Sequence, residues 1–315
     1  MHPAFSVIFF TTASGAGYGL LALMSLLAAL DRLPPDRWFG LAGLGLGLTA
    51  VSVGLLSSTF HLGHPERAWR ALSQWRSSWL SREGLIACIT FVPAGLFALG
   101  WVMLGTHDGV WAGFGLITFF LSLATIACTA MIYASLKPIP RWSNGWTLPA
   151  YLMLGLMTGE LWLNALTLAF GLGDPPQAWI TLGLIALAAA AKLGYWRHID
   201  SAEPRSTAES ATGLGALGKV RLLEAPHSSE NYLMREMGFR IARKHATKLR
   251  RIAVLLAFVL PLLLTLPLLV LSPAVGIALA FLAAISAMVG VFVERWLFFA
   301  QARHAVTLYY GASEV

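Results

Sequence analysis

The sequence predicts an all-α integral membrane protein with eight transmembrane helices, and three observations carry that prediction. The 315 residues are 57% apolar and only 12% charged, and the mean hydropathy of +0.69 lies well outside the range of soluble domains. Apolar runs of about twenty residues recur along the whole length, and each is long enough to cross a bilayer as a helix. Because lipid offers the backbone no hydrogen bonds, a helix that satisfies its own backbone is expected for each run.

We expect one polytopic domain over residues 1–315, with spans at 5–30, 38–60, 83–105, 110–136, 146–170, 177–198, 250–271 and 274–300. Turn-forming residues mark most of the breaks, in LPPDR, GTHDG, KPIPRWSNG, GLGDPPQ and LSPAVG. The first residues, MHPAFSVIFF, lack a basic region and a cleavage site, so we interpret them as part of a retained first span. Small residues in SGAGYG of span one and GLAGLGLGL of span two predict that helices approach closely there.

The connection between spans two and three carries the most ionisable chemistry of any short loop. We name residues 57–85, SSTFHLGHPERAWRALSQWRSSWLSREGL, the motif loop, and the membrane face that holds it the motif face. His61 closes span two and Glu83 opens span three, so we expect both at similar depth. A histidine and a carboxylate at the rim of the hydrocarbon suit proton-coupled chemistry on a buried redox carrier. The structural alternative is that His61 caps its own helix and that Glu83 pairs with Arg82 or caps span three.

The long loop, residues 200–249, divides into two parts. The first part, SAEPRSTAESATGLGALGK, is polar and rich in small residues. The second part alternates apolar and basic residues at roughly helical spacing, which predicts an amphipathic helix at about 229–250. It fits either an interfacial helix leading into span seven or a docking helix for a partner subunit.

The basic residues predict the orientation. With eight spans, the motif face also receives loop 137–146, the long loop and both termini, and all Lys and Arg except Arg32 and Arg37 lie on or near it. This bias predicts a cytoplasmic motif face with both termini inside. The dense arginines of the motif loop fit the same rule, or alternatively an acidic partner surface. The net charge of +7 is therefore a topology signal and a contact for anionic lipid, and it gives no reason to invoke nucleic acid.

Cysteines and histidines limit the metal chemistry. Cys88 and Cys128 lie in apolar runs and form no CxxC pair, which excludes a thiolate-bound iron–sulfur cluster or zinc site within this chain. All histidines except His107 belong to the motif face or its loops, whereas a pair of b-type haems would need ligands at two depths. A single haem near the motif face, for example on His61 with His198 or His304, stays open but is not favoured.

Glu160 is the carboxylate that the sequence places near the middle of a span, with Asn164 one turn on. A buried carboxyl there is costly and is a functional candidate. A neutral Glu160 that is hydrogen-bonded to Asn164 or to a neighbouring helix fits equally well.

Four stretches resemble the membrane-anchor subunit family of dimethyl sulfoxide reductase, whose members include the anchor of the cytoplasmic sulfite-oxidising enzyme of sulfur-oxidising bacteria. They are HPAFSVIFFTT, the motif-loop segments FHLGHPERAWRAL and SSWLSREG, ENYLMREMGFRIARKHA, and ERWLFFAQARHAVTLYYG. The resemblance covers nearly the whole chain, and its most specific part is the HLG and SREG of the motif loop. This sequence is richer in arginine after that motif.

The resemblance implies an eight-helix anchor that exchanges electrons with quinone, either ubiquinone or menaquinone, in a bacterial inner membrane. It implies a four-cluster iron–sulfur subunit docked on the cytoplasmic face, which in turn binds a molybdopterin catalytic subunit. The family's quinol-binding histidine and glutamate fall on His61 and Glu83, which we predict to be the catalytic pair. Arg82 and His64 are expected beside the quinone.

Four functions fit at least part of this pattern. The leading hypothesis is a quinone-reactive anchor that passes electrons between its iron–sulfur partner and quinone during sulfite oxidation, because a cytoplasmic motif face fits that branch of the family. The nearest alternative is the anchor of a dimethyl sulfoxide or other S- or N-oxide reductase, which would oxidise quinol. A secondary transporter would favour inverted repeats and helices broken at midplane, whereas the ionisable groups here sit at one rim. A purely structural anchor would tolerate loss of His61.

Overall fold

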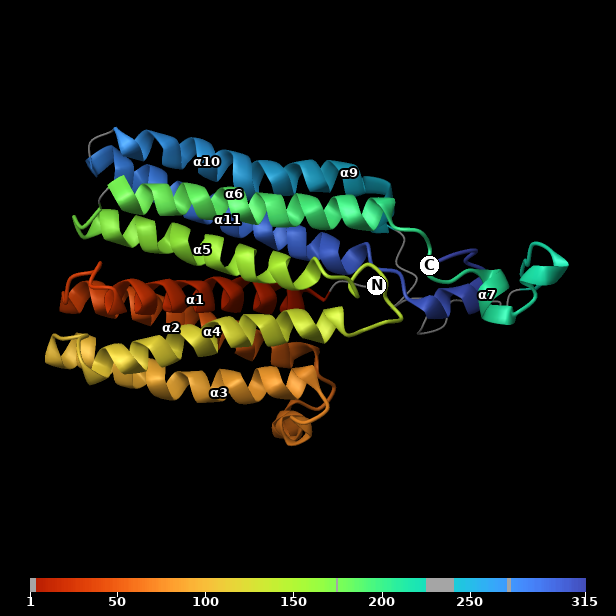
Figure 1. Cartoon of the computed structure of the whole chain (residues 1–315), viewed down its shortest axis with the longest axis horizontal. Coiled ribbons are helices and arrows are strands. Elements are labelled where there is room, and N and C mark those ends of the chain that lie inside the picture. Colours follow the sequence, from red (N-terminus) through yellow and green to blue (C-terminus); the bar gives the residue numbers. More distant parts are fainter. Residues whose placement is uncertain (1–3, 174, 225–240, 271–272) are drawn as a thin grey trace.

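The computed structural model describes residues 4–173, 175–224, 241–270 and 273–315, and within them every named element is helical. Eight helices of this part are long and apolar enough to cross a membrane, which confirms the predicted spans. They are α1 (Phe5–Ala29), α2 (Arg37–Ser58), α3 (Trp79–Ala98) continued by the π-helical η3 (Leu99–Leu104), α4 (Val110–Ala134), α5 (Thr147–Ala169), α6 (Pro175–Ser201), the run α9 (Ile241–Val254), η5 (Leu255–Val259), α10 (Leu260–Thr265) and η6 (Leu266–Leu269), and α11 (Pro273–Ala300). They lie side by side in one bundle (Figure 1).

The start of α3 differs from the prediction. Ser78 has an extended backbone, and its side-chain oxygen accepts a hydrogen bond from the Ser81 amide at 3.4 Å, so the helix begins at Trp79. Serine is a favoured N-cap because it satisfies one of the free amides of the first turn. Glu83 therefore lies one turn inside the helix and does not open it.

Helix α1 is the centre of the bundle. Of its most apolar stretch, 83% of the residues are buried, against 28–67% for the other seven spans. It packs against α2, α4 and α5, and more lightly against α11. In Figure 1 it lies between a group formed by α2, α3 and α4 and a group formed by α5, α6, α10 and α11.

Glycines set the spacing around α1. A Cβ atom added at Gly19 would lie 2.0 Å from the Gly155 carbonyl oxygen, and one added at Gly159 would lie 2.2 Å from the Gly19 carbonyl carbon. On another side of α1, a Cβ atom at Gly17 would lie 2.8 Å from the carbonyl oxygen of Gly47 in α2. Since no real Cβ approaches so closely, the backbones touch at these points. The predicted close approach of spans one and two is confirmed, and α1 makes an equally close contact with α5.

The seventh span is continuous through η5 despite Pro261. Proline cannot donate to the carbonyl four residues before it, and the π-helical turn Leu255–Val259 ends two residues before Pro261. The Ser286 hydroxyl of α11 donates to the Leu256 carbonyl oxygen at 2.8 Å, which satisfies one group freed by the irregular turn. A Cβ at Gly290 would lie 2.2 Å from the Ala257 amide nitrogen, so α11 passes very close to this turn.

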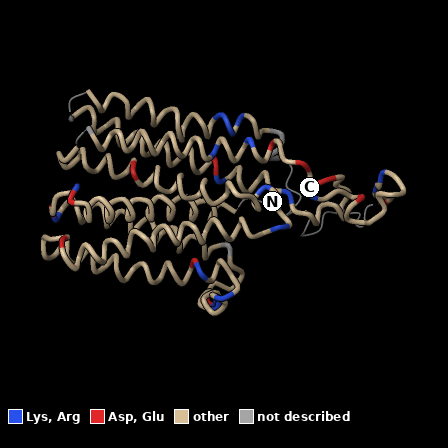
Figure 2. The backbone as a smooth tube through the Cα atoms, in the orientation of Figure 1, with Lys and Arg blue, Asp and Glu red and all other residues tan. Residues whose placement is uncertain are grey.

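The loops at one end of the bundle form a small extramembrane layer. Here α7 (Ala208–Thr212) and η4 (Gly215–Leu217) lie near η7 (Ala305–Tyr310), and Thr207 and Glu314 form an antiparallel bridge. The start of α1 and the C-terminus lie at this end in Figure 1, and Figure 2 shows most charged residues gathered towards it. Most of the amphipathic helix predicted at 229–250 falls within residues 225–240, which lie outside the described part. The described part resumes at Ile241, where α9 begins.

The glycine contact between α1 and α5 predicts a stability effect. Gly19→Ala should destabilise the protein by about 1–3 kcal/mol, because the new methyl group forces two backbones apart. The measurement is the midpoint of thermal aggregation in mild detergent. Gly45→Ala is the matched control, since a Cβ there meets no atom within 4 Å. Equal midpoints for the two variants would contradict the close contact.

Candidate functional site

The motif loop folds against the start of α3. It contains two short 3-10 helices, η1 (Thr59–His61) and η2 (Pro65–Gln74), and η2 packs on α3. A Cβ atom at Gly84 would lie 2.8 Å from a methyl carbon of Leu72, so the side chain of Leu72 rests on the helix backbone next to Glu83. The loop therefore covers the first turns of α3.

Arginine and tryptophan alternate over the loop surface. The guanidinium groups of Arg70 and Arg76 lie 5.7 Å and 5.2 Å from the ring centroids of Trp69 and Trp75. Both tryptophans are exposed. Tryptophan with basic side chains is typical of the membrane–water interface, so the loop has the composition of a segment at headgroup level.

Arg82 holds the end of the loop. Its Nε donates to the Trp75 carbonyl oxygen at 2.9 Å and its Nη2 donates to the Arg76 carbonyl oxygen at 2.7 Å. Its guanidinium also lies 4.3 Å from the ring centroid of Trp79. Two of its donors are thus engaged by the loop backbone, which gives Arg82 a clear part in positioning the loop.

His64 and His61 have different surroundings. The Nδ1 atom of His64 lies 3.0 Å from an exposed carboxylate oxygen of Glu66, and both side chains are exposed to solvent. His61 is the last residue of η1, and α1 contacts that short helix. Its side chain lies outside the described part, so its contacts with Glu83 stay a prediction.

Glu83 is buried, with 3% of its surface exposed, and it faces α4. The Thr129 hydroxyl is its partner there, and the same hydroxyl lies 3.0 Å from the Thr125 carbonyl oxygen. A hydroxyl carries one proton but can also accept. Thr129 can therefore donate to an ionised Glu83, or accept from a protonated Glu83 while donating to Thr125.

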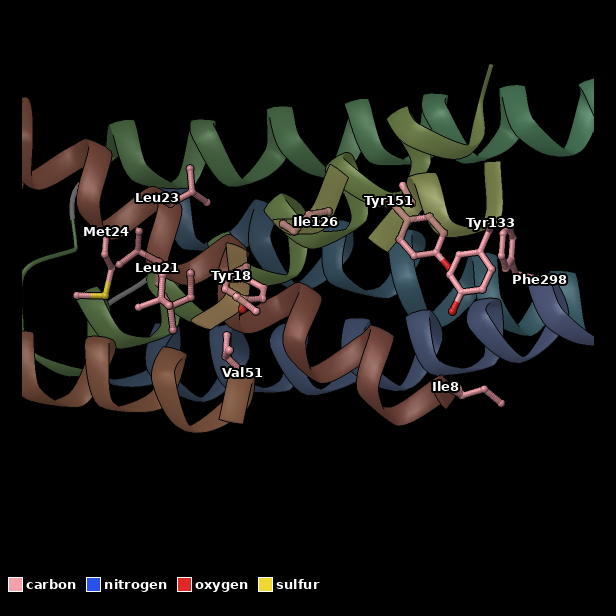
Figure 3. Close-up of a cluster of buried hydrophobic side chains, with 14 of the residues drawn as sticks. Ile8, Tyr18, Leu21, Leu23, Met24, Val51, Ile126, Tyr133, Tyr151 and Phe298 are labelled. Carbon is pink, nitrogen blue, oxygen red and sulfur yellow. The ribbon is translucent and has the colours of Figure 1, made fainter. Parts of the chain in front are cut away.

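A small polar cavity lies beside this pair, between α1, α4, α5 and α11. Its volume is about 10 Å³, roughly the space for one water molecule. The polar side chains around it include Tyr18, Thr129, Tyr151 and Arg295. The two tyrosine hydroxyls have no hydrogen-bond partner among the described residues. Figure 3 shows Tyr18, Ile126 and Tyr151 in this region, with Tyr133 and Phe298 next to Tyr151.

A buried ionic cluster lies close to the cavity, and we did not predict it. The Lys192 ammonium in α6 pairs with the Glu294 carboxylate in α11, and each side chain is 1% exposed. The second oxygen of Glu294 lies 3.4 Å from Nη1 of Arg295, whose guanidinium lies 3.5 Å from the Tyr151 ring centroid. The charges inside AAAAKLGYW and FVERWLF are visible in the sequence, but no local pattern shows that they pair.

The motif face opens into a larger cavity of about 140 Å³, lined in part by Arg141, His198 and Glu203. Burial is the main cause that lowers the pKa of the Arg141 guanidinium from its usual value, and the nearby Arg303 lowers it further. His304 acts as a cap, because its Nδ1 accepts a hydrogen bond from the Val306 amide at 3.0 Å. Within the described ranges, no group of three or more His, Cys, Asp or Glu side chains is arranged to hold a metal ion.

Glu160 belongs to a separate cluster. Its Oε1 accepts hydrogen bonds from the Gln177 amide nitrogen at 2.5 Å and from the Thr181 hydroxyl at 3.1 Å, both on α6. The neighbouring-helix arrangement is therefore the one observed. Since α6 begins at the end opposite the motif face, Glu160 lies towards that other end.

The fold and the site define a multi-pass membrane protein with a buried carboxyl and a buried ionic cluster beneath one face. The chain belongs to the DMSO reductase anchor subunit (DmsC) family, whose model matches residues 1–311. It is 34% identical to a sulfite dehydrogenase subunit of Allochromatium vinosum over 98% of this chain and 99% of that protein. It is also 23% identical to the anaerobic dimethyl sulfoxide reductase chain YnfH of Escherichia coli, over 66% of this chain and 73% of that protein.

The bonds of Arg82 predict how the motif loop responds to its loss. Arg82→Gln should speed chymotrypsin cleavage within residues 60–79 by roughly threefold or more, because two charge-assisted hydrogen bonds to the loop backbone are lost. The measurement is the cleavage rate of the protein in detergent. Arg70→Gln is the matched control, since it removes a surface guanidinium stacked on Trp69. If the two variants are cut at the same rate, Arg82 does not hold the loop.

Proposed function

We propose that this chain is the membrane-anchor and quinone-reactive subunit of a molybdopterin and iron–sulfur oxidoreductase. In this role it passes electrons from the iron–sulfur partner to membrane quinone during sulfite oxidation. The observation that carries the proposal is the buried carboxyl of Glu83, one turn inside α3 beneath the motif loop and in contact with a hydroxyl able to donate or accept. The similarity to the sulfite dehydrogenase subunit of Allochromatium vinosum, over nearly the full length of both chains, supports the choice of sulfite.

The surroundings of Glu83 fit a quinone headgroup. Such a ring is flat and apolar with two carbonyl oxygens, so it requires apolar walls and a few well-placed polar groups. Phe60 and Leu62 flank His61 with 85% and 40% of their surfaces exposed, and they offer an apolar approach from the lipid. Glu83 supplies the polar end inside the bundle.

In this proposal, the residues of this chain supply the protons that quinone reduction takes up. Reduction of a quinone to a quinol takes up two electrons and two protons. In the proposal, His61 donates a hydrogen bond to one carbonyl oxygen, and Glu83 delivers protons to the reduced ring. Thr129 keeps the Glu83 carboxyl in place in both of its protonation states. Arg82 and His64 complete the site from the loop, Arg82 by holding its backbone.

The partner docks on the motif face in this proposal. The exposed tryptophans and arginines of the motif loop provide a surface for a four-cluster iron–sulfur subunit, which brings electrons close to Glu83 and carries the molybdopterin subunit. The charge bias of the short loops supports a cytoplasmic motif face in a bacterial inner membrane. Water on that side would then supply the protons.

The proposal predicts the effect of removing either member of the pair. His61→Ala and Glu83→Gln should each lower sulfite-driven quinone reduction by roughly 100-fold or more, because a donor or a proton carrier is lost. Sulfite-driven reduction of a soluble artificial acceptor by the same purified complex should stay at the wild-type rate. Turnover with ubiquinone and menaquinone analogues is measured in parallel.

Glu160→Gln is the matched control, since it changes another buried carboxyl at the opposite end of the bundle and should leave quinone reduction intact. Normal quinone turnover in the His61 and Glu83 variants would refute the site. A complex that oxidises quinol to reduce an S-oxide, and does not oxidise sulfite, would refute the proposed direction of electron flow.

The orientation gives an independent prediction. Alkaline phosphatase fused after Val315 should be inactive, and a fluorescent protein at the same position should be bright, because the basic motif face stays in the cytoplasm. A phosphatase fused in the Gly105–Gly109 loop at the opposite face should be active. The reversed pattern would place the partner subunits outside the cytoplasm and argue against the sulfite-oxidising branch.

A further inference from the structure

We infer that the buried ionic cluster Lys192, Glu294 and Arg295, together with the small cavity beside Tyr18 and Tyr151, conducts protons from water at the motif face to Glu83. This inference rests on the proposed function, because it supplies the protons that quinone reduction consumes. It concerns residues on α6 and α11, whereas the motif loop connects α2 and α3.

The outer end of the route is the cavity open at the motif face. Arg141 lines that cavity, and its carbonyl oxygen accepts a hydrogen bond from the Tyr195 hydroxyl at 2.8 Å. The Lys192 ammonium lies 3.8 Å from the centroid of the Tyr195 ring. Tyr195 thus lies between a solvent-facing cavity and a lysine that is itself buried.

The middle of the route is the ionic cluster. Glu294 contacts Lys192 with one carboxylate oxygen and Arg295 with the other. Lys192 and Glu294 can each gain and lose a proton, whereas an arginine stays charged. Arg295 therefore carries no proton, and its part is to keep Glu294 close to the cavity and to orient a water molecule there.

The inner end of the route is the small cavity. Arg295, Tyr151, Tyr18 and Thr129 converge on a space of about 10 Å³, which is roughly the volume of one water molecule. A buried water is stable when it has two to four polar partners, and the hydroxyls of Tyr18 and Tyr151 are free among the described residues to serve. Thr129 then contacts Glu83 directly, so polar groups lie in series from the open cavity to the carboxyl, and in the inferred route water bridges the steps that no direct hydrogen bond joins.

The cost of such a cluster argues for a function. Buried ion pairs in a bundle seldom stabilise it more than apolar residues of similar volume would, and ionisable groups inside membrane helices mark proton and ion pathways. Glu160 shows the contrast, because its observed partners are an amide and a hydroxyl on one neighbouring helix. The cluster of α6 and α11 instead lies between the cavity at the motif face and the small cavity that Arg295 lines.

The electrons and protons of the proposed quinone reduction balance. Two electrons come from the iron–sulfur clusters of the partner, and two protons leave Glu83 for the oxygens of the reduced ring. Each proton that leaves Glu83 is replaced through Thr129 and the cavity water, and the cluster recovers it from water at the motif face. No other oxidant or reductant takes part.

The test uses the purified complex with Glu294→Gln, Glu294→Asp and Glu160→Gln as variants. Glu294→Gln should lower sulfite-driven quinone reduction by about 100-fold at an unchanged KM for the quinone. Its turnover should also acquire a larger solvent deuterium isotope effect, because proton delivery becomes rate-limiting. Glu294→Asp should restore most of the rate, and Glu160→Gln should match the wild type in both rate and isotope effect.

Wild-type turnover in Glu294→Gln, or a lower rate with an unchanged isotope effect, overturns the inference. If Glu294→Gln leaves Lys192 unpaired and the complex does not assemble, the double variant Lys192→Met with Glu294→Gln removes both charges and is held to the same criteria. Glu83→Gln separates the two proposals. Loss of turnover in Glu83→Gln with normal turnover in Glu294→Gln refutes only the proton route, whereas normal turnover in Glu83→Gln refutes the quinone site itself.

Discussion

The contact between the backbones of α1 and α5 at Gly19, Gly155 and Gly159 is the constraint on which the rest of the structure depends. Without hydrophobic attraction between helices in lipid, close packing and hydrogen bonds must hold a bundle together. Because α1 touches α5 on one side and α2 on another, it can sit at the centre and carry side chains towards both groups of helices. Tyr18 of α1 and Tyr151 of α5 meet at one cavity as a direct result.

Two of the buried carboxyls in the bundle, Glu83 and Glu160, have similar burial but different surroundings. Both Glu83 and Glu160 are removed from water and lipid, where an unpaired charge is costly. One oxygen of Glu160 is held by an amide and a hydroxyl from α6. Glu83 also has a threonine hydroxyl as its partner, but that hydroxyl lies next to a space lined by more polar groups. Burial alone does not distinguish them; the connection of Glu83 to other exchangeable groups does.

Much of the fold could be predicted because a bilayer imposes a length on every apolar run. All eight spans followed from that length, whereas the first turn of α3 was missed because Ser78 caps the helix before the apolar run becomes obvious. The residues of the motif loop stood out by their charge. Lys192, Glu294 and Arg295 were visible too, yet their pairing depends on how α6 and α11 face each other, which no local pattern encodes.

The π-helical turn at Leu255–Val259 has a consequence for how this family can vary. One extra residue in a helix rotates everything before it by about 100° relative to everything after it. Arg250 lies before the turn and forms an ion pair with Asp200 at the end of α6, at 2.5 Å, while Ala257 within the turn presses against Gly290. Loss of a single residue there would leave the span long enough to cross the membrane, but its basic end would face a different neighbour. A change of length in this helix therefore rotates its basic end about the helix axis. Homologues that lack the turn would need another partner for Asp200.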